Sequence, residues 1–84
     1  MPEISRFYGM VVKMFFRQRE HGVPHIHVVY GDFNGVIAIG TGEMLIGDLP
    51  NNALTLIRQW LEMHRAELLA MWESQKISSL PPLM

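Results

Sequence analysis

The sequence predicts an α+β fold, in which an antiparallel sheet of three or four strands packs one face against a single long C-terminal helix. Apolar and polar residues alternate over residues 8–17 and 25–30, which is typical of half-buried strands. Apolar residues then recur at steps of three and four over residues 53–72, which is typical of an amphipathic helix. We therefore expect one domain spanning residues 1–84, with residues 75–84 as an extended tail.

The expected strands cover residues 8–17, 25–30 and 36–39, and a short fourth strand covers residues 43–46. In the first strand the even-numbered positions are all apolar and are expected to face inward: Tyr8, Met10, Val12, Met14 and Phe16. In the second strand an apolar set alternates with a more polar set that contains two histidines: Ile26, Val28 and Tyr30 against His25, His27 and Val29. Glycine, aspartate and asparagine in residues 31–35 favour a turn before the third strand.

The helix is expected to begin at residues 48–51, because Asp48 and Asn51 can cap free N–H groups and Pro50 fits a first turn. One wide apolar stripe should pack on the inward face of the sheet, and its members are Ala53, Ile57, Trp60, Leu61, Leu68, Met71 and Trp72. The stripe also places His64 on the helix's apolar side, so we expect that residue to be at least partly buried. Two prolines near the end of the chain forbid further helix.

Composition excludes several classes of protein. The 84 residues carry seven Lys and Arg against eight Asp and Glu, a net charge of −1, so the net charge does not support nucleic-acid binding. No apolar run approaches the length of a membrane span, and the amino end is unlike a signal peptide, so a cytoplasmic protein without membrane contact is expected. With no cysteine and a small core, the chain is a good candidate for a homo-oligomer or for binding a small protein partner.

One face of the predicted sheet has no helix to cover it. If residues 8–17 and 25–30 form a hairpin, this uncovered face mixes apolar and cationic side chains: Val11, Lys13, Phe15, Arg17, His25, His27 and Val29. Such a mixture indicates a contact surface.

His25 and His27 are the most distinctive local feature, because residues two apart in a strand lie on the same face. Three interpretations stay open: ligands of a divalent metal, an acid–base pair for phosphodiester hydrolysis, or polar residues without a special role. For hydrolysis, the catalytic residues would be His25 and His27 for proton transfer, with Lys13 and Arg17 stabilising phosphate charge.

A metal site needs at least a third ligand, and the set considered is His25, His27 and His64, with His21, Asp32 and Glu43 as other candidates. Within one chain, strand alternation works against this set, since it directs His25 and His27 away from the helix that carries His64. The set would need an irregular start of that strand or His64 from a second subunit. No cofactor is predicted, and a divalent metal remains an alternative.

Several segments carry a resemblance to a known family. They are residues 1–9, Pro24-His25-Ile26-His27-Val28, Thr41-Gly42-Glu43 leading to Gly47-Asp48-Leu49-Pro50, and Trp60 to Trp72. Over almost the whole chain, the sequence resembles domain-of-unknown-function family 4160. Val23 departs from the pattern, because the family often has a second proline there. The resemblance implies a small prokaryotic protein encoded beside another small protein, in some cases in a toxin–antitoxin-like pair.

The sequence and the resemblance therefore predict a small bacterial-type module of unknown function that acts through a protein partner or as a homodimer, in a toxin–antitoxin-like pair. A histidine-dependent nuclease or hydrolase, and a metal-binding module, are the alternatives, and both would use the Pro24–His27 segment.

Overall fold

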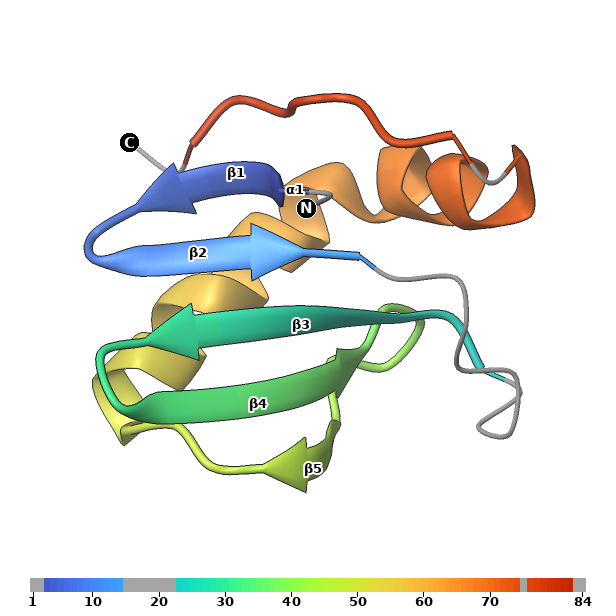
Figure 1. The fold of residues 1–84 in the computed structure, drawn as a ribbon. Helices are drawn as coiled ribbons and strands as arrows, with labels where there is room; N and C mark the ends of the chain where they lie inside the picture. Colours follow the sequence, from blue (N-terminus) through green and yellow to red (C-terminus); the bar gives the residue numbers. More distant parts are fainter. Residues whose placement is uncertain (1–2, 15–22, 75, 83–84) are drawn as a thin grey trace.

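The computed structural model describes residues 3–14, 23–74 and 76–82. These residues form a five-stranded antiparallel sheet in which every strand pairs with its neighbours in the chain. The strands are β1 (Glu3–Phe7), β2 (Met10–Lys13), β3 (His25–Tyr30), β4 (Phe33–Ala38) and β5 (Met44–Gly47). One helix, α1 (Asn51–Ser74), crosses one face of the sheet (Figure 1). The α+β prediction is confirmed, but the sheet has five strands instead of three or four.

The extra strand is β1, and it comes from a turn that the sequence analysis placed inside a strand. Tyr8 and Gly9 both have positive φ, 50° and 80°, which closes a two-residue hairpin between β1 and β2. The expected inward position of Tyr8 is therefore wrong, since 57% of that residue is exposed. Met10, Val12 and Met14 are fully buried as predicted. The remaining calls on the first strand, for Phe15, Phe16 and Arg17, lie outside the described residues.

β3 has the predicted bounds, whereas β4 begins at Phe33, three residues earlier than expected. The turn between them needs only Gly31 and Asp32, and Gly31 has a φ of 58°. β5 begins and ends one residue later than predicted, and its pairing with β4 contains a bulge that leaves Leu45 as an extra residue. After β5 the chain turns at Gly47, where φ is 89° and a Cβ atom would overlap the carbonyl oxygen of Asn34.

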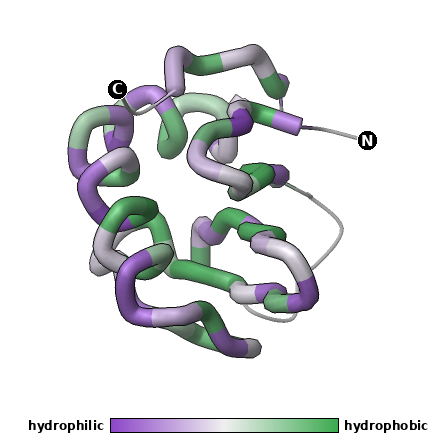
Figure 2. Tube along the Cα trace, turned by 90° about the vertical axis from the view of Figure 1, so that its left-hand side faces the viewer, coloured by the Kyte–Doolittle hydropathy of each residue, from purple (hydrophilic) through white to green (hydrophobic). Residues whose placement is uncertain are grey.

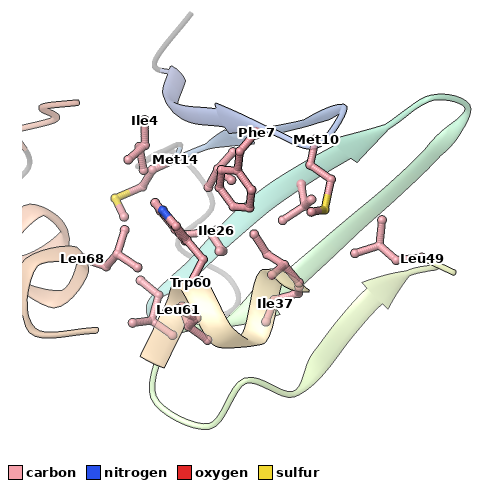
Figure 3. Packing of buried hydrophobic residues seen from close by; sticks show 14 of the residues in the cluster. Ile4, Phe7, Met10, Met14, Ile26, Ile37, Leu49, Trp60, Leu61 and Leu68 are labelled. Carbon is pink, nitrogen blue, oxygen red and sulfur yellow. The ribbon is translucent and has the colours of Figure 1, made fainter. Parts of the chain in front are cut away.

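The core lies between α1 and the covered face of the sheet. Six of the seven predicted stripe residues are buried, and the seventh, Trp72, is half-buried. Trp60 is fully buried at the centre, with its ring 5.6 Å from that of Phe7, measured between centroids (Figure 3). Every strand except β5 contributes buried apolar residues to this core. Burial of this apolar surface is the main stabilising contribution to the fold.

The C-terminal tail covers the β1 edge of the sheet (Figures 1 and 2). The backbone N–H of Leu80 donates to the carbonyl oxygen of Ile4 at 3.0 Å, and the indole Nε1–H of Trp60 donates to that of Pro81 at 2.8 Å. The two bonds tie the tail to both the sheet and the helix. Within the described residues, α1 lacks the run of apolar residues that a helix needs to cross a membrane.

Candidate functional site: the open face of the sheet

The strand register shows which side chains share the sheet face opposite α1, which we call the open face. Residues directly opposite each other in an antiparallel pair point to the same side. One row across the sheet runs from Lys13 through His27 and Val36 to Ile46. A second row runs from Arg6 through Val11 and Val29 to Asn34. The placement of Val11, Lys13, His27 and Val29 agrees with the face predicted for them.

The two rows frame a shallow depression of about 280 Å³. Its lining combines one ammonium group, from Lys13, and one imidazole, from His27, with aliphatic side chains. β4 and β5 contribute five of its lining residues: Asn34, Gly35, Val36, Ile46 and Gly47. This combination can hold a group that is partly apolar and partly anionic.

His25 starts β3 and is fully buried. Its Nδ1 lies 2.8 Å from the carbonyl oxygen of Val23. A carbonyl oxygen only accepts hydrogen bonds, so Nδ1 carries the proton and donates it. The ring also packs against Trp72 near the end of α1, with 4.9 Å between centroids. The helix therefore reaches a histidine that strand alternation assigns to the open face.

His27 is half-buried and lies beside His25, with 5.4 Å between ring centroids. The convergence of these two imidazoles, expected from their spacing, is present. Across the strand pair, His27 stands directly opposite Lys13. Three of the four proposed catalytic residues are thus close together, and the fourth, Arg17, lies outside the described residues.

Lys13 carries the charge of this site. In the part of the chain that the structure describes, the ion pairs join Arg6 to Glu3, Arg65 to Glu62 and His64 to Glu67, so no described carboxylate is within pairing distance of Lys13. Hydrogen bonds from Arg6 lower the pKa of Glu3 below its ordinary value, and the nearby charge of Lys13 lowers it slightly further. Glu3 is therefore held by Arg6, and among the described residues no carboxylate neutralises the ammonium of Lys13.

His64 belongs to a different environment. It sits at a kink in α1, where its φ of −119° and ψ of 18° depart from helical values. It is buried as predicted, its Nδ1 lies 2.8 Å from Oε1 of Glu67, and its ring lies 5.2 Å from that of Trp60. Its Nε2 is buried and has no hydrogen-bond partner among the described residues.

The described residues contain no group of three or more His, Asp or Glu side chains placed to hold a metal ion. Among them, His64 therefore does not join His25 and His27, nor do Asp32 or Glu43 complete a set with those two histidines. His21, the remaining candidate ligand, lies outside the described residues.

Sequence reasoning missed the contribution of β4 and β5 to this site. Val36 and Ile46 line the depression beside His27, yet Gly35 interrupts the alternation of β4 and a bulge interrupts that of β5. The contact between His25 and Trp72 also had no local signal, because it joins the start of β3 to the end of α1.

Comparison with known proteins gives one match. The family described as "Domain of unknown function (DUF4160)" matches residues 9–73, a segment that contains β2 to β5 and almost all of α1. Searches of curated proteins and of solved structures returned no significant match.

Proposed function

The chain belongs to this family of domains of unknown function, DUF4160, and from that premise we propose that it acts by binding a protein partner on the open face of its sheet, as one member of a toxin–antitoxin-like pair. The observation that carries the proposal is a sheet face, uncovered by any described element, that combines aliphatic side chains with an ammonium group that pairs with no described carboxylate.

The aliphatic part of the open face is continuous across the sheet. Val11, Val29 and Val36 are half-buried, and Ile46 at the edge is 49% exposed. No other described element covers them, because α1 lies on the opposite face (Figure 1). A contiguous apolar patch with a polar rim is the usual form of a protein-binding surface.

The charges on the open face favour a partner that differs from this chain. Lys13, Arg6 and His27 face this side, and Glu3 is the described carboxylate among them. Because Arg6 is paired with Glu3, a second copy bound through the same face would bring the ammonium of Lys13 to both sides of the contact, and this like-charge repulsion costs free energy. A different chain that presents aliphatic side chains and carboxylates is the complementary surface.

Neither edge of the sheet competes well with the open face as a binding site. The C-terminal tail covers the β1 edge through the bond from Leu80 to Ile4. The β5 edge carries a bulge at Leu45, a feature that discourages the addition of another strand. The partner is therefore expected to bind across the face rather than along an edge.

The test is to co-express the chain with the product of the adjacent reading frame in its genome and to measure complex formation by light scattering after gel filtration. Ile46→Asp and Val29→Asp place a carboxylate on the open face and should weaken the complex by about tenfold or more. Ile46→Lys should weaken it less, because the proposed partner is acidic.

Met63→Asp is the matched control, since Met63 is 62% exposed on α1, away from the open face. Circular dichroism establishes that each variant is folded. The proposal is contradicted if Met63→Asp breaks the complex while both open-face variants bind normally, or if the chain alone forms a homodimer that the open-face variants disrupt and binds no second protein.

Histidine-dependent phosphodiester hydrolysis is a second candidate, favoured by the placement of His25, His27 and Lys13 beside one depression. Only His27 and Lys13 line that depression, since His25 is fully buried, so His27 would exchange the proton and Lys13 would stabilise the charge. RNA cleavage by purified protein should then fall with His27→Asn and with the double change His25→Ala, His27→Ala. If the folded double variant kept full RNA cleavage or full growth arrest, the hydrolase hypothesis would be rejected.

A further inference from the structure

We infer that the depression on the open face is a subsite for an aliphatic carboxylate presented by the partner, with the carboxylate on Lys13 and the aliphatic group against Val36 and Ile46. The inference rests on the proposed function and specifies the chemistry of its contact.

The first step concerns charge. Lys13 is half-buried, and no described carboxylate pairs with it, although Glu3 is near enough for the charge of Lys13 to affect its pKa. Glu3 is engaged by two hydrogen bonds from Arg6, at 3.0 and 3.1 Å. An anion placed beside Lys13 therefore meets a positive charge that no described carboxylate neutralises.

The second step concerns the type of anion. Lys13 provides a single fixed positive charge, which matches the single negative charge of a carboxylate. A phosphate group carries more charge and is usually held by several donors or by a bidentate arginine. Among the described residues no arginine lines the depression, so a carboxylate is the better match for its described lining.

The third step concerns size and shape. The volume of about 280 Å³ lies just below the range of typical small-molecule pockets, about 300–1,000 Å³. Beyond His27, the row that starts at Lys13 continues through Val36 to the exposed side chain of Ile46, and Asn34 is the polar side chain that β4 adds to the lining. A carboxylate attached to a branched aliphatic side chain fills both halves, as in a C-terminal leucine or valine.

The experiment is a titration of the isotope-labelled full chain followed by NMR, with N-acetyl-leucine as the probe and N-acetyl-leucinamide as its uncharged analogue. N-acetyl-leucine should shift the signals of Lys13, Val36 and Ile46 in a saturable way, and the amide should bind about tenfold more weakly or worse. Inorganic phosphate should not saturate the same signals.

Lys13→Met should weaken N-acetyl-leucine binding by about tenfold. Lys76→Met, in the exposed tail, is the matched control and should leave it unchanged. Equal binding of the acid and the amide, or unchanged binding to Lys13→Met, would overturn the inference.

A competition arm separates a partner-borne carboxylate from a free small acid. Excess N-acetyl-leucine should weaken the complex with the partner, and Lys13→Met should weaken that complex too. If N-acetyl-leucine binds at Lys13 but leaves the complex unchanged, the partner does not supply the carboxylate. If Ile46→Asp breaks the complex and Lys13→Met does not, the proposed function stands and this subsite is rejected.

Discussion

The two faces of β3 differ in how strongly packing against α1 constrains the residue types found there. Ile26 and Val28 point toward α1 and are fully buried, whereas His27 and Val29 point to the open face and are half-buried. Burial of the first pair is what the fold requires, because the helix must cover an apolar surface. The second pair is free of that requirement, and its mixture of imidazole and aliphatic groups is consistent with the partner binding that we propose.

The largest expected loss of stability comes from a substitution in the core, on the covered face of the sheet. Trp60→Ala removes a fully buried ring that packs on Phe7 and donates a hydrogen bond to Pro81, so the free energy of unfolding should fall by about 3–5 kcal/mol. Urea denaturation measures the change. Met63→Ala, on the exposed side of the same helix, should stay within about 0.5 kcal/mol of the wild type. Equal losses from both variants would show that the core does not lie where the structure places it.

A second pair of variants compares the two faces directly, because Val28 and Val29 are neighbours in β3 with the same side chain. Val28→Ala should lower the free energy of unfolding by about 2 kcal/mol, since Val28 is fully buried. Val29→Ala should cost less than about 1 kcal/mol, since Val29 is only half-buried. Thermal and urea unfolding provide the measurement, and the comparison fails if Val29→Ala proves the more damaging change.

His64 is a buried polar residue on the side of α1 that packs on the sheet. Its Nε2 is buried without a hydrogen-bond partner among the described residues, which costs free energy that an apolar side chain would not. His64→Leu should therefore leave stability unchanged or raise it by about 1 kcal/mol, and it should also favour the helix at the kink. A clear loss of stability in urea would mean that the bond from His64 to Glu67 outweighs the cost of the buried nitrogen.

The smallest expected effect is a change in the pKa of Glu3, at the rim of the open face. The hydrogen bonds from Arg6 lower the pKa of Glu3, so Arg6→Gln should move that pKa up toward its ordinary value near 4.5. Because the pKa is lowered in the folded state, the stabilisation is present above the ordinary pKa and is lost as the pH falls through the folded value. NMR of the carboxyl carbon follows the titration, and an unchanged Glu3 pKa in Arg6→Gln would contradict the assigned cause.

The sequence predicted the structure best where the apolar pattern belongs to a single strand or helix. The alternation in β3 and the spacing of the α1 stripe predicted both elements closely, including the burial of His64. The turn at Tyr8 and Gly9 was hidden, because Tyr8 is a bulky residue that rarely adopts a positive φ and it continues an apolar alternation. The strand count was therefore too low.

The site was less predictable, because it depends on how separate elements meet. His25 and His27 were found from their spacing, and Lys13 from the expected hairpin. The burial of His25 under Trp72 depends on where α1 ends relative to β3. The depression depends on the register of β4 with β5 and on the bulge at Leu45, which local sequence patterns do not specify.

The central claim is that the open face binds the partner, and methyl NMR on the complex tests it most directly. The valine and isoleucine methyl groups divide between the faces, with Val29, Val36 and Ile46 on the open face and Ile26 and Val28 on the covered face. We predict that adding the partner shifts the open-face methyl signals most and leaves those of the covered face nearly unchanged. Shifts confined to the covered face, or to the exposed side of α1 around Met63, would contradict the account.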